Sequence, residues 1–365
     1  MIFKKWQGRY QYIVQEPVFM MDRNRNIVIG IAIVFVLACA FVIMGQQGGE
    51  KEKTVVVYTS VDQVYSEQVF HDFEKETGIR VMPVYDVEAT KTTGLVNRLI
   101  AEKARPQADV FWSGEFSQTI VLKHKSILAQ YRSPAAGDIP AQFKDPESYW
   151  TGFGGRARIF IVNTDLLTPS QYPHSIYDML DDRYQGKTVG IAYPMFGTTA
   201  TQAAALYNYL GKKKAREFFS SLNNRSVRVA DGNSVVRDLV ADGQLFYGLT
   251  DTDDACGAIE NGKNVTIVIP DQAEGEMGTL VIPNTVALIA GGPHPTEAKV
   301  FINYLLDRKR ESAMVSSGWI QIPVRDIPGS PCINGTAIKT IPVTYQDTYD
   351  ALQPAQEDLI TIFIR

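Results

Sequence analysis

The sequence Thr250-Asp-Thr-Asp-Asp254 places three carboxylates within four residues. Carboxylates this close repel one another unless a cation lies among them or water solvates each one. A helix start accounts for one or two acidic residues, because the helix dipole favours negative charge there. Asp251, Asp253 and Asp254 are therefore candidates for a cation-binding site. A solvated acidic helix start is the alternative explanation.

Polar residues in the first half of the chain follow short apolar runs that are typical of buried strands. Ser60 and Asp62 follow Thr54–Tyr58, and Glu115 follows Ala108–Trp112. Ligands of open parallel sheets bind beyond the carboxyl ends of the strands. We therefore expect these side chains to gather at one edge of a sheet and to contact a ligand. For each residue alone, capping of the next helix is the alternative.

Two further segments are candidates for binding an anion. Gly197, Thr198 and Thr199 open a predicted helix after the strand-like run Thr188–Ala192. The N-terminus of a helix presents free backbone N–H groups and favours anions. The other candidate segment follows the predicted strand Ile79–Tyr85, and its residues are Thr90, Lys91 and Thr92.

Arg156 and Arg158 alternate with Ala157 at the start of the predicted strand Ile159–Val162. Either arginine can face a ligand, and Arg156 is the candidate that we assign to the ligand site. A buried structural ion pair is an equally good explanation for an arginine in a strand.

The elements that must position these residues alternate between strand and helix patterns. From Thr54 to Trp112 the chain reads strand, helix, strand, helix, strand, which is a parallel α/β unit. The pattern restarts near Lys187. Other predicted elements are a helix at Phe116–Leu128, strands at Thr279–Pro283 and Asn284–Ile289, and a helix around Tyr345–Leu352.

Composition limits the class of protein. A chain of 365 residues is long enough for two ordinary domains, and 45% hydrophobic with 21% charged residues is typical of a soluble globular protein. A net charge of −4 argues against nucleic-acid binding. Cys256 and Cys332 are expected to form a disulfide in an oxidising compartment, with two buried free thiols as the alternative.

Residues 1–53 differ from the rest of the chain. Ile27–Met44 carries no charge and follows several basic residues, a pattern that predicts a membrane-spanning or signal-anchor helix with a cytoplasmic N-terminus and an exported body. Cys39 ends a lipobox-like sequence, so a lipidated Cys39 is an alternative tether. An uncleaved anchor is favoured because the chain stays apolar after Cys39, and no small-residue site supports signal-peptide cleavage.

Several motifs in order resemble one family. They are Val55–Ser60, Phe73–Ile79, Ala108–Trp112, Gly155–Arg158, Val235–Gly243 and Ala290–Pro295. Together they resemble the extracellular solute-binding proteins of ABC importers (family 1), in the branch that includes the periplasmic ferric-binding proteins. The resemblance covers about Thr54 to Arg325.

The resemblance implies a type II periplasmic-binding-protein fold with two α/β lobes. Each lobe would be a mixed sheet flanked by helices, with the ligand in the cleft and hinge closure around it. We expect lobe 1 to comprise residues 54–150 and 284–324, and lobe 2 to comprise residues 151–283 and 325–365. It also implies an ABC permease and ATPase as partners, a monomer, a periplasmic or extracytoplasmic location and no covalent cofactor.

The metal site of the ferric-binding branch transfers only in part. By this resemblance Asp62 falls where that branch has a histidine, Gly114 and Glu115 straddle the position of its glutamate, and Asp251 to Asp254 replace a tyrosine pair. The expected cargo is Fe³⁺ or another hard cation with a synergistic anion, because carboxylate oxygens suit such ions. The candidate metal ligands are Asp62, Glu115, Asp251, Asp253 and Asp254.

Two other functions remain open. A phosphate- or phosphonate-bearing or zwitterionic solute can place its anion at the threonine segments and its cationic end at the acids. A secreted hydrolase is the distant alternative, because the sequence contains no nucleophile elbow, P-loop or His-Glu-x-x-His motif. We therefore expect a binding protein rather than an enzyme.

Overall fold

The computed structural model describes residues 52–86, 93–184, 188–333 and 338–363. The chain divides into two compact units, Met1–Glu52 and Lys53–Arg365, and the fold below is that of the second unit. Within the described ranges, no helix is both long and apolar enough to cross a bilayer. The predicted membrane segment Ile27–Met44, with Cys39, lies outside the described residues.

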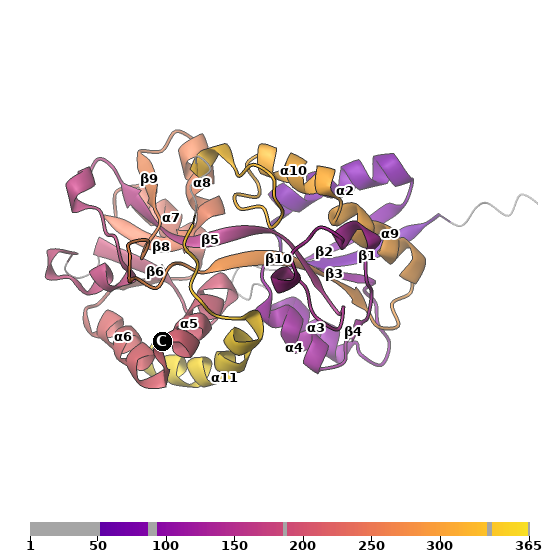
Figure 1. Ribbon diagram of the computed structural model, residues 1–365, viewed down its shortest axis with the longest axis horizontal. Coiled ribbons are helices and arrows are strands. Elements are labelled where there is room, and N and C mark those ends of the chain that lie inside the picture. The colour runs from indigo at the N-terminus through magenta and orange to yellow at the C-terminus, as the bar shows by residue number, and fades with distance from the viewer. Residues whose placement is uncertain (1–51, 87–92, 185–187, 334–337, 364–365) are drawn as a thin grey trace, which may run out of the picture. The chain divides into compact units, whose positions relative to one another are not determined.

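Strands and helices alternate along most of this unit (Figure 1). The strands are β1 (Thr54–Thr59), β2 (Arg80–Tyr85), β3 (Val110–Ser113), β4 (Leu128–Ala129), β5 (Thr151–Asn163), β6 (Val189–Ala192), β7 (Arg228–Ala230), β8 (Tyr247–Asp251), β9 (Val265–Val268) and β10 (Val281–Ile289). The α-helices are α2 (Gln63–Thr77), α3 (Thr93–Ala101), α4 (Ser117–His124), α5 (Gly197–Leu210), α6 (Lys212–Asn224), α7 (Asn233–Ala241), α8 (Thr252–Glu260), α9 (Pro295–Leu305), α10 (Arg308–Ser316) and α11 (Tyr345–Ile362).

Each half of the unit is built on a mixed sheet. In the first half, β2, β1 and β3 are parallel, and β10 adds antiparallel to β3. In the second half, β7, β6 and β8 are parallel, and β5 adds antiparallel to β8. The parallel strands are largely apolar because helices cover their faces. This is the two-lobe α/β architecture that the sequence predicts.

Two long strands, β5 and β10, pass from one half to the other (Figure 1). The first part of β5, Thr151–Ala157, pairs with β10, and the second part, Arg158–Asn163, pairs with β8 and β9. The β5–β10 register shifts between Pro283 and Asn284. Opposite this shift, Gly154 has a positive φ of 47° and packs against Ile320. The crossing point is therefore irregular in both strands.

Three predicted elements differ from the structure. The two strands expected on either side of Pro283 form one strand, because a proline without an N–H is tolerated where the register shifts. The helix expected over Phe116–Leu128 ends at His124, and β4 begins at Leu128. The helix expected over Tyr345–Leu352 continues to Ile362.

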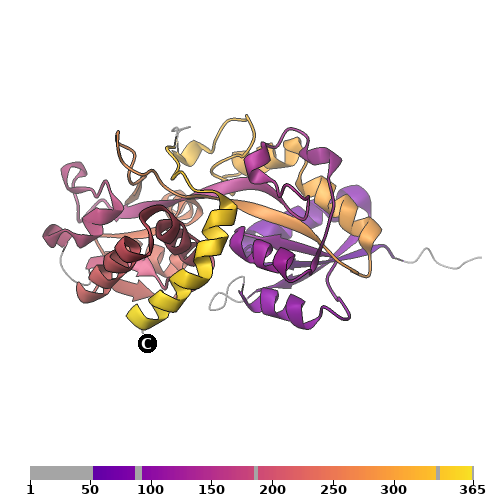
Figure 2. The ribbon, with the colours of Figure 1, turned by 60° about the horizontal axis from the view of Figure 1, so that its bottom comes forward.

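The C-terminal helix α11 runs through Pro354 (Figure 2). A proline in a helix interior costs about 3 kcal/mol. Burial of Leu352, Ala355 and Leu359, on a helix that packs against α5 and α6, offsets this cost. Packing therefore extends the helix predicted around Tyr345–Leu352 through the proline to Ile362.

Cys256 and Cys332 form a disulfide in the structure. Cys256 lies on α8 directly after the acidic run, and Cys332 lies in a short 3-10 helix near the chain's C-terminal part. The bond therefore holds the first turns of α8 to a segment distant in sequence.

Candidate functional site

Polar residues that follow strands of both sheets line one cavity. It encloses about 770 Å³ of empty space, part of which is open to solvent. Its lining includes every predicted site residue that the structure describes: Ser60, Asp62, Glu115, Arg156, Gly197, Thr198, Thr199, Asp251, Asp253 and Asp254. The remaining predicted residues, Thr90, Lys91 and Thr92, lie outside the described residues. Acidic groups from the two halves of the chain thus face one hollow.

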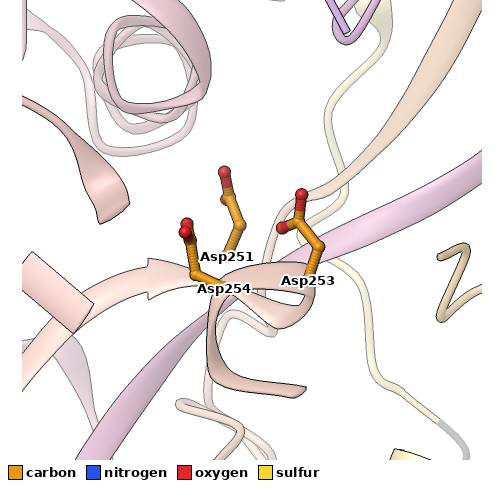
Figure 3. Close-up of side chains that lie close together, drawn as sticks. All are labelled: Asp251, Asp253 and Asp254. Atoms are coloured by element: carbon orange, nitrogen blue, oxygen red, sulfur yellow. The ribbon is translucent and has the colours of Figure 1, made fainter. Parts of the chain in front are cut away.

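Asp251, Asp253 and Asp254 lie where β8 ends and α8 begins. One carboxylate oxygen of each lies within 4.8 Å of the others, and the three side chains project to the same side of the ribbon (Figure 3). This spacing suits a cation between them. Their other contacts, however, give each acid a different character.

Asp251 belongs to a buried polar cluster. Its carboxylate accepts hydrogen bonds from Arg158 Nη1 at 2.7 Å, Thr198 Oγ1 at 2.6 Å and Asn233 Nδ2 at 3.1 Å. The side chain of Arg158 is 0% exposed and also donates to Gln202. Asp251 and Arg158 therefore form a buried ion pair, which is the structural role that we considered for an arginine in this strand.

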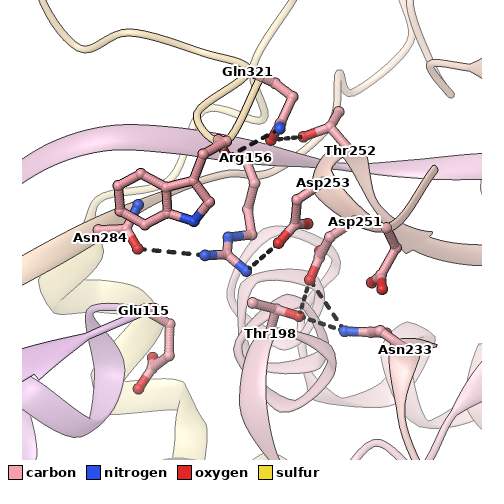
Figure 4. Close-up of polar contacts among 12 residues, drawn as sticks. Glu115, Arg156, Thr198, Asn233, Asp251, Thr252, Asp253, Asn284 and Gln321 are labelled. Carbon is pink, nitrogen blue, oxygen red and sulfur yellow. Dashed lines mark hydrogen bonds and ion pairs between the residues drawn. The ribbon is translucent and has the colours of Figure 1, made fainter. Parts of the chain in front are cut away.

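Asp253 pairs with the other arginine. Arg156 Nη1 donates to Asp253 Oδ2 at 2.7 Å, and Arg156 Nη2 donates to Asn284 Oδ1 at 3.3 Å (Figure 4). The side chains of Arg156 and Asp253 are 13% and 11% exposed, and both residues line the cavity. Unlike Arg158, Arg156 therefore has a ligand-accessible charge.

The third acid, Asp254, has a raised pKa. Burial, together with the charges of Asp253 and Asp251, raises the pKa of Asp254 to about 8. Thr250 Oγ1 donates to its carboxylate at 2.9 Å, and Arg237 Nη1 lies 3.5 Å from it. A proton or an added cation can therefore relieve the repulsion among these acids near neutral pH.

Glu115 is held by backbone groups. Its carboxylate accepts from the N–H of Ser117 at 2.6 Å, from the N–H of Gln118 at 2.9 Å and from Thr201 Oγ1 at 3.1 Å. Burial raises the pKa of Glu115, although these hydrogen bonds oppose the shift. Glu115 thus caps α4 and links it to α5, which is the alternative role considered for residues after strands.

The first residues of α5 line the cavity, and the hydroxyls of Thr198 and Thr199 have protein partners. Gly197 has a positive φ of 56°, and the first turn of a helix leaves its N–H groups without intrahelical acceptors. Thr198 Oγ1 donates to Asp251, and Thr199 Oγ1 donates to Asn233 Oδ1 at 3.1 Å. An anion here would meet N–H groups first.

The sequence reasoning missed several lining residues, above all Tyr65, Tyr193, Phe196, Asp231 and Asn233. Tyr65 lies three residues after Asp62, a spacing that puts both on one face of α2. Burial and the charges of Asp253, Asp254 and Asp62 raise the pKa of Tyr65 to about 12. The cavity therefore contains a phenol, although the tyrosine pair of the ferric-binding branch is replaced.

Comparison with known families gives a match over most of the chain. The model of the family described as bacterial extracellular solute-binding proteins matches residues 68–326. The matched range starts inside α2 and ends beyond α10, so it covers most of both sheets and most of the residues that line the cavity, but not β1 or Asp62.

Individual relatives are more distant. A putative 2-aminoethylphosphonate-binding periplasmic protein of Salmonella paratyphi A is 27% identical over 284 residues, 75% of this chain and 80% of the relative. An Fe(3+)-binding periplasmic protein of Serratia marcescens is 21% identical over 274 residues, 74% of this chain and 78% of the relative. A ferric binding protein from Campylobacter jejuni has the same fold, with a TM-score of 0.77 and 19% identity over 85% of this chain and 100% of that one.

Proposed function

This chain belongs to the bacterial extracellular solute-binding proteins, and we propose that it captures a small solute for an ABC importer. The proposed cargo is ferric iron or another hard cation, bound with an accompanying anion in the cavity between the two sheets. The observation that carries this proposal is the trio Asp251, Asp253 and Asp254, whose oxygens lie within 4.8 Å of one another in that cavity.

The cavity offers complementary sites for the two parts of such a cargo. Burial, and then the charges of Asp253 and Asp251, raise the pKa of Asp254, so a bound cation would stabilise the ionised form of this carboxylate. The N-terminus of α5 and the guanidinium of Arg156 line the same cavity and favour an anion. The Fe(3+)-binding relative from Serratia marcescens supports this choice of cargo.

A zwitterionic or phosphonate-bearing organic solute is the second candidate. The specific observation in its favour is that arginines already pair with Asp251 and Asp253, so the charge of a trivalent ion is less well matched than that of an ammonium group. The relative named for 2-aminoethylphosphonate supports this candidate.

The remaining parts of the proposal follow from a role in uptake. The partners are an ABC permease and ATPase, the protein is a monomer outside the cytoplasm, and the N-terminal segment tethers it to the membrane. Residues 54–150 with 284–324 and residues 151–283 with 325–365 form the lobes that close on the cargo. The protein is not an enzyme, in keeping with a family of binding proteins.

Native mass spectrometry of the purified chain and thermal unfolding with added solutes test the proposal. Ferric citrate, manganese chloride or 2-aminoethylphosphonate at a hundredfold excess over Kd should stabilise the protein by about 2.7 kcal/mol. The double variant Asp253→Asn with Asp254→Asn should lose this stabilisation.

The matched control is Asp182→Asn with Asp242→Asn, which neutralises two carboxylates that are 78% and 55% exposed. The control should bind as the parent does. Binding by the Asp253/Asp254 variant with the affinity of the parent would place the cargo elsewhere. Stabilisation by ferric citrate alone or by 2-aminoethylphosphonate alone decides between the two candidates.

A further inference from the structure

Arg156 lines the cavity next to the acidic trio, where its positive charge can interact with a bound cargo. It projects from the crossing strand β5, and its guanidinium lies between Asp253 and Asn284 (Figure 4). On the side of the first sheet it lies over Gly114, where an added Cβ would be 3.4 Å from Nη2. Its side chain is 13% exposed, so a ligand in the cavity can reach it.

Without a cargo, the guanidinium serves as a tethered cation for the acidic trio. A metal ion that enters with no anion must compete with Arg156 for Asp253, and it also places two positive groups side by side. A cargo that brings an oxyanion removes this conflict, because guanidinium binds phosphonate and carboxylate through paired N–H donors. The five donors of Arg156 include two that bond Asp253 and Asn284 among the described residues.

We propose that Arg156 is the specificity-determining residue of this cavity. It exchanges Asp253 for the oxyanion of the cargo, so the cavity selects solutes with both a cationic centre and an oxyanion and disfavours bare cations. This inference rests on the proposed function of the same cavity. It adds the chemical class of cargo that the cavity accepts and the side chain that enforces the choice.

Arg158 cannot play this part, although it lies only two residues away. Its side chain is 0% exposed, is absent from the cavity lining and donates to Asp251, Gln202 and Asn233. The exchange is therefore specific to Arg156.

Calorimetric titration of the full chain and of Arg156→Gln tests the exchange. The probes are manganese chloride as a bare cation, 2-aminoethylphosphonate as a zwitterion and ferric citrate as a metal with an oxyanion. Loss of a charge-assisted hydrogen bond should weaken 2-aminoethylphosphonate by about tenfold or more. Removal of the tethered cation should tighten manganese by about tenfold.

Opposite signs for the two probes are the expected result. Equal weakening of both probes, or no change in either, would mean that Arg156 is only structural and would overturn the inference. Tightening of both would mean that Arg156 merely blocks the cation site, which also overturns it. Failure of the parent to bind any of the three probes removes the proposed function, and the inference with it.

Arg156→Lys keeps the proposal testable if Arg156→Gln fails to fold. Lysine preserves the positive charge beside Asp253 but cannot contact two acceptors in the planar geometry of guanidinium. This variant should bind manganese as weakly as the parent does and bind 2-aminoethylphosphonate less tightly than the parent. Tighter manganese binding by Arg156→Lys would contradict the exchange. Arg183→Gln, with a side chain that is 58% exposed, is the control for the loss of one arginine and should match the parent.

Discussion

Arg156 and Arg158 lie two residues apart on β5, and each pairs at 2.7 Å with an aspartate from the β8–α8 junction. Arg158 is directly opposite Asp251 in the β5–β8 ladder, is fully buried and is surrounded by polar side chains of α5 and α7. Arg156 and Asp253 lie in the cavity instead. The same pair of residue types is therefore a buried part of the second sheet at one position and lines the cavity at the next.

The largest expected effect is a difference in the free energy of unfolding between variants of the two arginines. Arg158→Met leaves Asp251 buried without its main counter-ion and should lower the free energy of unfolding by about 3–5 kcal/mol. Arg156→Met should cost clearly less, because its pair is partly exposed to the cavity. Urea unfolding of both variants measures the difference. Equal losses would show that the two pairs do the same structural work.

Loss of the disulfide should lower stability by a somewhat smaller amount. It should also disturb the Arg156–Asp253 pair more than the Arg158–Asp251 pair. Cys256 lies on α8, three residues after Asp253, whereas Asp251 ends β8. Replacement of Cys256 and Cys332 by serine should cost about 2–4 kcal/mol, because the bond joins residues 76 apart in sequence.

Loss of the disulfide should also make α8 less rigid and so lower the affinity for the solute, even where the variant is fully folded. Titration of the double serine variant at a temperature where it is fully folded measures this effect, and reduced parent protein serves as the matched control. Unchanged affinity in both would show that the disulfide does not position Asp253.

The smallest expected effect is the change of stability with pH that is caused by Asp254. The pKa of Asp254 is about 8 in the folded protein and about 4 in an unfolded chain. The folded state therefore binds more protons between these values, and the free energy of unfolding should fall by up to about 1.4 kcal/mol per pH unit as the pH rises toward 8. Asp254→Asn should flatten this dependence.

Denaturant unfolding between about pH 6 and pH 8 checks the sign. Asp242→Asn, at a carboxylate that is 55% exposed, should keep the profile of the parent. Stability that rises with pH in the parent, or parallel profiles for the parent and Asp254→Asn, would contradict the raised pKa of Asp254.

Much of the fold follows from local sequence patterns. Short apolar runs such as Thr54–Tyr58 are buried between helices, and their periodicity is visible without any tertiary information. The candidate residues could be chosen because polar side chains that follow parallel strands must share one edge of the sheet. Asp62, Glu115 and Asp251 accordingly line the same cavity.

The roles of these residues could not be read in the same way. Arg158 and Asp251 are 93 residues apart, so their pairing depends on the register between β5 and β8. The hydrogen bonds that tie Glu115 to α4 and Thr201 likewise depend on how two helices meet. The full length of α11 also depends on packing, because contact with α5 sustains the helix through Pro354, which alone disfavours it.

The C-terminal helix has a consequence for motion between the halves of the unit. Although α11 packs mainly on α5 and α6, Tyr345 contacts Phe116 with ring centroids 4.2 Å apart, and Tyr349 stacks on His124 at 4.9 Å. Aromatic contacts of this kind contribute about 0.5–1.5 kcal/mol each. α11 therefore links α4, which follows the first sheet, to α5 of the second, and any motion that separates these two helices must break the aromatic contacts.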